Sequence, residues 1–185
     1  MEPFRLFRSS TQMLMVDVQE RLLPAISGSE EIRRNILRLI RASEVLQIPF
    51  FYTEQYPRGL GPTDGEILSS LPAGARRFEK NHFSCCDEEG FTDFLELTGL
   101  NRIVLFGIET HICILTTLLD LLARGRKVVL VADACGSRAP GNADLALKAA
   151  AAAGALVVPT ETVIYQLMGQ SGTAEFKTLL PLFKD

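Results

Sequence analysis

The sequence predicts an α/β protein built on a doubly wound, six-stranded parallel sheet. Short apolar runs alternate with longer amphipathic stretches along all 185 residues. This is the pattern of repeated β-α units, in which helices cover both faces of a parallel sheet. No repeat, low-complexity linker or break in composition divides the chain, so we expect a single domain over residues 1–185.

Three strands and two helices are expected in the first half of the chain. The strands are 13–17, 48–53 and a short third strand over 76–80. Between the first two strands, Ser29 can cap a long helix whose apolar residues fall near helical period. A second helix, over 91–97, follows the third strand.

The second half of the chain repeats the alternation with three more strands, each followed by a helical stretch. In chain order, these strands and helices are expected at 103–106, 114–120, 127–132, 142–153, 155–159 and 173–183. Doubly wound sheets commonly have the strand order 3-2-1-4-5-6, with a ligand-binding crevice between the first and fourth strands. We therefore expect this order here.

Three chemically active side chains fall at one edge of this sheet. Asp17 ends the first strand, Lys80 ends the third, and Cys113 lies in the first turn of the helix after the fourth. In the expected order Asp17 and Cys113 flank the crevice, and Lys80 lies two strands from Asp17, about 10 Å at ~4.8 Å per strand. Because a helix N-terminus favours negative charge, the Cys113 side chain is predicted to tend toward the thiolate.

This arrangement suits nucleophilic catalysis. Cys113 can attack a carbonyl carbon, Asp17 can take the thiol proton and return it to the leaving group, and Lys80 can stabilise negative charge. Backbone N–H groups in the turn before Cys113 can bind the oxyanion. The competing interpretation is that Cys113 is a small buried hydrophobe and that Asp17 and Lys80 form an edge ion pair without a catalytic role.

Several motifs resemble the isochorismatase-like cysteine hydrolase superfamily. They are Val-Asp-Val-Gln at 16–19 after an apolar run, a lysine after the third strand, and Gly-Ile-x-Thr-x-x-Cys at 107–113. The resemblance covers about residues 11–167, and the segments 53–62 and 133–138 resemble the subgroup called isochorismatase domain-containing proteins. It implies a three-layer α/β/α sandwich of Rossmann-like topology, assembled as homo-oligomers such as dimers, tetramers or larger rings.

The resemblance also implies roles for individual residues. Asp17, Lys80 and Cys113 match the catalytic residues of the superfamily. A cis peptide bond is expected before Glu109, so that the backbone N–H groups of Glu109 and Cys113 form the oxyanion hole. Because Cys113 is present, the acid-catalysed cleavage of a vinyl ether by true isochorismatases is not expected.

No metal and no organic cofactor are expected. The metal-binding Asp-x-His pair that nicotinamidases of this superfamily carry is absent after the second strand. The glycines at 59 and 61 do not form the dinucleotide-binding fingerprint, because no G-x-G-x-x-G sequence opens the first helix.

Substrate contacts are predicted from the loops at the same edge of the sheet. Gln55, Tyr56 and Arg58 lie on the loop after the second strand, and Arg58 would favour an anionic substrate unless it is simply solvated. Phe83, after the third strand, is predicted to form an apolar wall of the pocket. His111 either binds substrate at the mouth of the crevice or caps the helix and faces solvent.

Composition bounds the partners and the compartment. The net charge of −3 and the absence of a long basic run argue against nucleic acid, and no run approaches 18 apolar residues, so no membrane span is expected. The segment 1–8 lacks the apolar core of a signal peptide, which predicts a cytoplasmic protein with free thiols. The neighbouring cysteines Cys85 and Cys86 are expected to fill space rather than to form a strained disulfide.

The leading hypothesis is a cytoplasmic amidase-type hydrolase that cleaves a small amide or related carbonyl compound through a thioester-type intermediate on Cys113. One alternative is a non-catalytic binding or scaffold protein that retains the fold. Another is a redox-active thiol protein that pairs Cys113 with Cys85 or Cys86.

Overall fold

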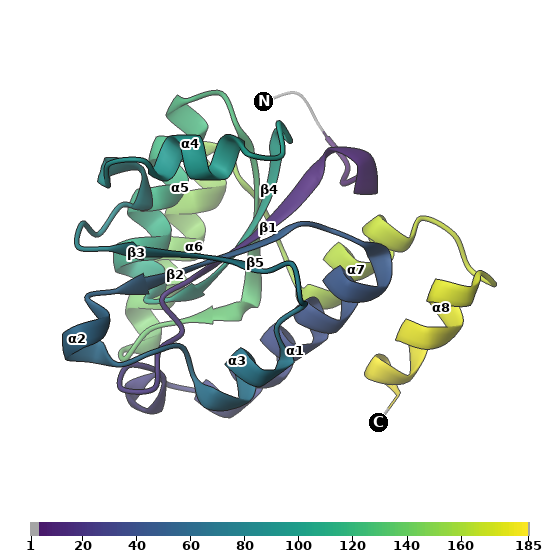
Figure 1. Cartoon of the computed structure of the whole chain (residues 1–185), viewed down its shortest axis with the longest axis horizontal. Coiled ribbons are helices and arrows are strands. Elements are labelled where there is room, and N and C mark those ends of the chain that lie inside the picture. Colours follow the sequence, from purple (N-terminus) through teal and green to yellow (C-terminus); the bar gives the residue numbers. More distant parts are fainter. Residues whose placement is uncertain (1–3, 185) are drawn as a thin grey trace.

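The computed structural model describes residues 4–184 and contains one six-stranded, all-parallel sheet in the order β3-β2-β1-β4-β5-β6 (Figure 1). The predicted strand order is therefore confirmed. The strands are β1 (Thr11–Val16), β2 (Phe50–Gln55), β3 (Arg76–Lys80), β4 (Arg102–Ile108), β5 (Lys127–Gly136) and β6 (Leu156–Val158). The first three residues of the N-terminal segment considered above lie outside the described residues.

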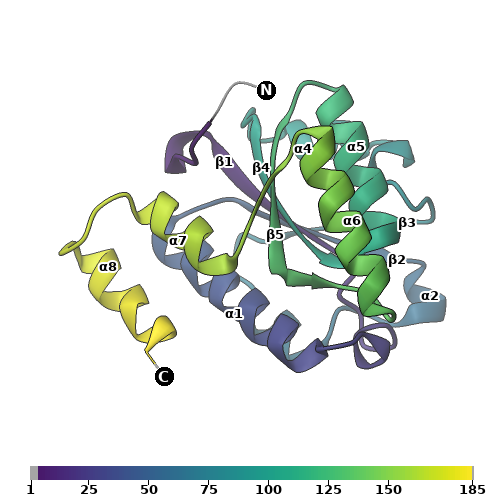
Figure 2. The same cartoon turned by 180° about the vertical axis from the view of Figure 1, so that it is seen from behind.

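Helices cover both faces of the sheet, so the structure has three layers with the sheet in the middle. On one face α1 (Ser29–Leu46) packs beside α7 (Thr160–Met168), with α3 (Gly65–Ser70) and α8 (Ala174–Leu179) against α1. On the other face, seen from behind in Figure 2, lie α4 (Phe91–Glu96), α5 (Leu115–Ala123) and α6 (Pro140–Ala153). None of the described helices is both long and apolar enough to cross a membrane.

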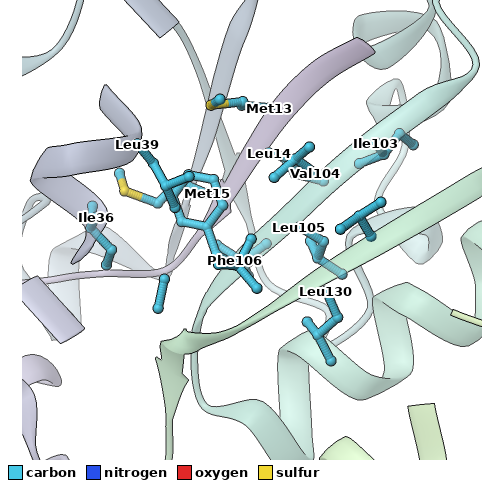
Figure 3. Close-up of a cluster of buried hydrophobic side chains, with 14 of the residues drawn as sticks. Met13, Leu14, Met15, Ile36, Leu39, Ile103, Val104, Leu105, Phe106 and Leu130 are labelled. Carbon is cyan, nitrogen blue, oxygen red and sulfur yellow. The ribbon is translucent and has the colours of Figure 1, made fainter. Parts of the chain in front are cut away.

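The core lies on the two faces of the central strands (Figure 3). Every residue of β1 is buried, which is expected of a strand covered on both sides. Met15 pairs in register with Phe106 on the face toward Ile36 and Leu39 of α1. Burying one such side chain contributes about 1.5–3 kcal/mol. This packing supports the carboxyl ends of β1 and β4.

The start of α1 differs from the prediction. Gly28, with φ of 72°, is the N-cap, and Ser29 is the first helical residue and makes no side-chain cap. The predicted cap at Ser29 is therefore wrong by one residue. The left-handed conformation at the cap position suits glycine, and Glu30 and Glu31 in the first turn interact favourably with the helix dipole.

The helix α7 was not predicted. Its sequence is rich in the β-branched residues threonine, valine and isoleucine, which have modest helix propensity. Its first turn is fixed by a distant group, because Asp133 Oδ1 of β5 accepts hydrogen bonds from the backbone N–H and the hydroxyl of Thr160 at 2.7 and 2.8 Å. Hydrogen bonds to a residue distant in the sequence thus fix the start of α7.

The loop after β2 also contains structure that the sequence did not reveal. Two short helices, α2 (Pro57–Leu60) and α3, lie between β2 and β3. Strand β5 continues to Gly136, beyond the predicted end at 132, because a register shift between Leu105 and Gly107 of β4 allows Cys135 and Gly136 to pair.

Candidate active site

Asp17 lies one residue beyond the end of β1, where the chain leaves the sheet. Its φ of 55° is in the left-handed region, which aspartate and asparagine tolerate better than most residues. The hydroxyl of Thr53 on β2 donates to Asp17 Oδ1 at 2.7 Å. The Asp17 side chain is completely buried, so its carboxylate depends on protein partners for stabilisation.

Gly107 allows β4 to approach this point closely. A Cβ atom at Gly107 would lie 2.1 Å from the carbonyl oxygen of Val16, and its φ of 127° is one that side chains disfavour. Only glycine therefore fits beside the last residue of β1. This close approach brings the turn that follows β4 next to Asp17.

Lys80 reaches Asp17 from two strands away, as the expected strand order requires. Lys80 Nζ lies 2.6 Å from Asp17 Oδ2, and both side chains are almost completely buried. Burial alone would lower the pKa of Lys80, but opposing interactions, chiefly with the charge of Asp17, outweigh it and raise that pKa above its ordinary value. The ammonium group is therefore charged at neutral pH.

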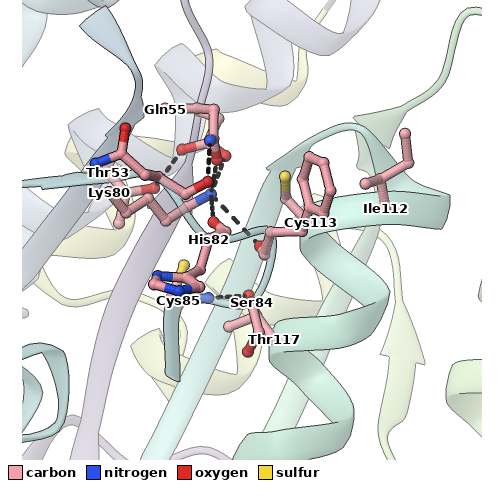
Figure 4. Close-up of polar contacts among 12 residues, drawn as sticks. Thr53, Gln55, Lys80, His82, Ser84, Cys85, Ile112, Cys113 and Thr117 are labelled. Atoms are coloured by element: carbon pink, nitrogen blue, oxygen red, sulfur yellow. Dashed lines mark hydrogen bonds and ion pairs between the residues drawn. The ribbon is translucent and has the colours of Figure 1, made fainter. Parts of the chain in front are cut away.

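Three further oxygens surround the Lys80 ammonium group (Figure 4). Gln55 Oε1 accepts from Lys80 Nζ at 2.6 Å, and the carbonyl oxygens of His82 and Phe83 lie at 3.1 and 3.4 Å. The Gln55 backbone is held in turn by Gln19, whose side chain accepts from the Gln55 N–H at 2.8 Å and donates to its carbonyl at 3.0 Å. The lysine is thus fixed by one charged and three neutral acceptors.

Cys113 sits in a π-helical turn, Thr110–Ile114, that leads into α5. The carbonyl of Glu109 accepts from the N–H groups of Ile112 at 3.1 Å and Ile114 at 3.3 Å, instead of from the Cys113 N–H that an α-helical turn would use. The peptide bond between Ile108 and Glu109 is cis, as the resemblance implied. The Glu109 carboxylate is bound to the backbone N–H and the Nε of Arg138.

The Cys113 thiol does not have the predicted thiolate character. Burial, followed by the charge of Asp17, raises its pKa to about 12, and the opposing effect of Lys80 is smaller. The prediction failed because it considered the helix terminus and not the depth of the site, where Cys113 is only 7% exposed. The resting side chain is a neutral thiol beside a carboxylate and an ammonium group.

The structure therefore brings together Asp17, Lys80 and Cys113, and adds two residues that the sequence did not single out. These are Thr53 and Gln19, which hold Asp17 and Gln55. The signal available in the sequence was weak. Gln19 follows Asp17 in the Val-Asp-Val-Gln motif, and Thr53 is a polar residue near the end of an apolar strand.

The predicted substrate contacts take different positions. Tyr56 and Arg58 are exposed and line a cavity of about 260 Å³ beside Lys80. Phe83 is 64% exposed on the wall of a cavity of about 500 Å³ between the 81–84 loop and α5. His111 Nδ1 lies 2.9 Å from the hydroxyl oxygen of Ser137. Their roles toward a substrate stay predictions.

All four cysteines are free and buried. Cys85 is completely buried, and its backbone N–H donates to the Thr117 hydroxyl at 3.0 Å. Burial raises the pKa of Cys85 and Cys135 to about 12 and that of Cys86 to about 11. Cys85 and Cys86 do not form a disulfide in the structure.

Residues 11–162 match the sequence profile of the isochorismatase domain. The chain belongs to the isochorismatase domain family. Members of this family are hydrolases, and the superfamily inferred from the motifs is confirmed.

This isochorismatase-domain chain is similar to curated and solved relatives. It is 38% identical over 179 residues to isochorismatase domain-containing protein 1 of Salmo salar, an alignment that covers 97% of the chain and 62% of that relative. The chain thus spans less than two thirds of the relative's length. Among solved structures, MAR1 ribonuclease from Caenorhabditis elegans is 35% identical, with a TM-score of 0.91 and coverage of 97% and 92% of the two chains. YcaC from Pseudomonas aeruginosa is 25% identical, with a TM-score of 0.89 and coverage of 96% and 91%.

Proposed function

We propose that this protein is an amidase-type cysteine hydrolase that cleaves a small amide or related carbonyl compound. The observation that carries the proposal is the buried Asp17–Lys80 ion pair beside the Cys113 thiol at the carboxyl edge of the sheet. An ion pair this deeply buried costs solvation energy, so its position beside a nucleophile favours a chemical role over a structural one.

In the first half of the reaction, Cys113 Sγ attacks the carbonyl carbon of the substrate. Because the thiol pKa is about 12, its proton passes to Asp17 as the carbon–sulfur bond forms. Asp17 then gives this proton to the leaving nitrogen, the carbon–nitrogen bond breaks, and an acyl thioester remains on Cys113.

In the second half, a water molecule attacks the thioester. Asp17 accepts a proton from the water, the carbon–sulfur bond breaks, and Asp17 returns the proton to the departing sulfur. The free acid leaves and the thiol is restored. Lys80 remains charged throughout and stabilises whichever group, Asp17 or the sulfur, carries the negative charge.

The oxyanion of each tetrahedral intermediate requires hydrogen-bond donors. We assign this role to the backbone N–H groups of Glu109 and Cys113. The π-helical turn supports the assignment, because the Glu109 carbonyl is bound by Ile112 and Ile114 rather than by Cys113. Removing one such donor typically costs about 10²–10³ in kcat.

The names of two relatives bear on the proposal. The YcaC structure contains covalent acrylamide, which supports the view that this fold can present a reactive nucleophile to a small electrophile. The Caenorhabditis elegans neighbour is called a ribonuclease. The net charge of −3 and the absence of a long basic run in this chain favour a small substrate over RNA, and a homo-oligomer in the cytoplasm is part of the same proposal.

The test is a screen of small amides followed by capture of the intermediate. Wild-type protein and Cys113→Ala are incubated with each amide, quenched in acid and analysed by intact and peptide mass. We expect acid release and a mass gain confined to the Cys113 peptide of the wild type. Hydrolysis that survives Cys113→Ala would refute the mechanism, and RNA included in the panel tests the ribonuclease activity named for the neighbour.

The screen, with mild oxidation of the same protein as a second measurement, tests the two alternative hypotheses. A binding or scaffold protein would hydrolyse nothing, with or without Cys113. A redox thiol protein would lose two daltons on mild oxidation as Cys113 pairs with Cys85 or Cys86.

A further inference from the structure

The Gln55 side chain is fixed at both ends. Its Oε1 accepts from Lys80 Nζ at 2.6 Å, and its Nε2 donates to the carbonyl oxygen of Asn81 at 2.7 Å. The orientation of this amide is unambiguous, because the ammonium group only donates and the carbonyl only accepts. Gln19 fixes the Gln55 backbone from the other side. Gln55 is thus held toward Lys80 before any substrate binds.

The partners of Lys80 differ in charge. An ammonium group has three N–H donors, and four oxygens lie around this one. Only Asp17 among these four is charged. The Gln55 amide makes the shortest neutral contact, while the two loop carbonyls are more distant at 3.1 and 3.4 Å.

Other titratable groups near Lys80 come from three directions. Asp17 follows β1, Cys113 lies in the π-helical turn, and Cys85 opens the 3-10 helix Cys85–Asp87. The His82 side chain is exposed and bound to Glu88, so it points away from Lys80 toward the surface. In the described part of the chain, one carboxylate therefore contacts the ammonium group directly.

We propose that Gln55 is a positioning residue, whose neutral amide oxygen holds the Lys80 ammonium group between Asp17 and Cys113 without adding a second negative charge. The inference rests on the proposed function, in which negative charge moves from Asp17 to the sulfur and back. Lys80 can follow that movement only if its charge is shared between these two groups. A second carboxylate would compete for it.

This role differs from the substrate contact predicted for Gln55 from the sequence. Each polar end of the amide already has a protein partner, so Lys80 and Asn81 set its orientation even if a substrate uses the remaining N–H or lone pair. A substrate contact affects KM. A positioning residue affects kcat and the reactivity of the sulfur, which can be measured without a substrate.

The test is the rate of Cys113 alkylation by iodoacetamide between pH 8 and 10, measured by peptide mass in wild type, Gln55→Glu and Gln55→Met. The control is Gln170→Glu, which adds the same charge at an exposed position. We expect Gln55→Glu to react at least about tenfold more slowly than both wild type and the control at each pH, which corresponds to one pH unit in thiolate fraction.

Gln55→Met keeps the side-chain length but loses the hydrogen bond to Lys80. It therefore provides a second test of the inference if Gln55→Glu does not fold. With any amide from the panel, we expect it to lower kcat about tenfold and to leave KM within about twofold, since one charge-assisted hydrogen bond is lost. Wild-type alkylation rates in Gln55→Glu, or a change in KM alone in Gln55→Met, overturn the inference. If no amide is cleaved by the wild type, the proposed function fails, whereas the alkylation profile still decides the role of Gln55.

Discussion

Two carboxylates are buried near the same edge of the sheet, and they differ in the groups that surround them. Glu54 of β2 and Asp17 after β1 are both almost inaccessible to solvent. Glu54 Oε1 accepts from the backbone N–H and the hydroxyl of Thr63 at 2.7 and 2.8 Å, and Oε2 lies 3.2 Å from Arg77. The Asp17 carboxylate accepts a hydrogen bond from the hydroxyl of Thr53 and forms an ion pair with the ammonium group of Lys80.

The difference between them lies in their partners. Arg77 is half exposed and shares its charge with Glu79, while Lys80 is buried and belongs to the Asp17 site. Glu54 binds the loop before α3 through Thr63, whereas the charge of Asp17 helps to raise the pKa of the Cys113 thiol. Burial of a carboxylate is thus not in itself a sign of catalysis, and the cation and the nucleophile beside it decide its role.

The largest expected effect comes from Asp17→Asn compared with Glu54→Gln. Asparagine tolerates the left-handed backbone at position 17, so the change removes charge without straining the chain. We expect amide hydrolysis to fall about 10²–10⁴-fold, as for loss of a general base. Alkylation of Cys113 should become faster, because the charge that helps to raise its pKa is gone.

Glu54→Gln is the control for that experiment. It should leave both hydrolysis and alkylation near the wild-type rates and lower the stability to urea by about 1–3 kcal/mol, the cost of weakening a buried hydrogen-bonded group. Equal losses of hydrolysis in the two variants would erase the distinction between the sites.

Removal of the cations gives the next contrast. Lys80→Met leaves the Asp17 carboxylate buried without its partner, which costs about 3–5 kcal/mol of stability. Arg77→Met removes a half-exposed partner, and we expect a loss of at most about 1 kcal/mol. Urea denaturation of the two variants measures both values. A smaller loss for Lys80→Met than for Arg77→Met contradicts the comparison.

A smaller effect is expected for Thr53→Val, which keeps the shape of the side chain on β2 and removes one hydrogen bond to Asp17. Stability should fall by about 1 kcal/mol. The remaining Asp17–Lys80 pair keeps its charge, so hydrolysis should fall less than in Asp17→Asn. Steady-state kinetics at saturating amide, with thermal unfolding of the same samples, test this order.

The last effect appears only at high pH, where the protein is expected to lose stability. The folded state raises the pKa of Lys80 and raises the pKa of Cys85, Cys113 and Cys135 to about 12. Groups whose pKa is raised on folding contribute their full stability below their unfolded pKa and lose it as the pH rises toward the folded value. The urea concentration at the unfolding midpoint should therefore decrease as the pH rises above about 8.5, the pKa of cysteine in the unfolded chain. A constant midpoint between pH 8 and 10.5 would contradict the raised thiol pKa values.

Much of this architecture could be read from the sequence, because strand ends in a parallel sheet share one edge. The alternation of apolar and amphipathic segments was enough to predict the strand order, and that order was enough to place Asp17, Lys80 and Cys113 together. The helix α7 escaped prediction because a distant aspartate fixes its first turn.

The protonation state of Cys113 and the hydrogen bonds of the Gln55 side chain could not be predicted from the sequence for a related reason. The pKa of a thiol depends on how deeply the assembled fold buries it, which the local sequence does not report. Gln55 was expected on a loop but is the last residue of β2, and the sequence does not reveal whether its side chain faces a substrate or a lysine. Only the position of Lys80 Nζ in space distinguishes the two.

The missing side chain of Gly107 has a consequence for how such a protein can diversify. Because the backbone of β4 lies directly against Val16, main-chain contact holds the carboxyl ends of β1 and β4 together, and these lead to Asp17 and to the Cys113 turn. The exposed residues around Tyr56 and Phe83 stand on loops outside that contact. Under the proposed function, substitutions there are expected to change which substrates enter while Asp17 and Cys113 keep their separation, so that specificity can vary on an unchanged centre.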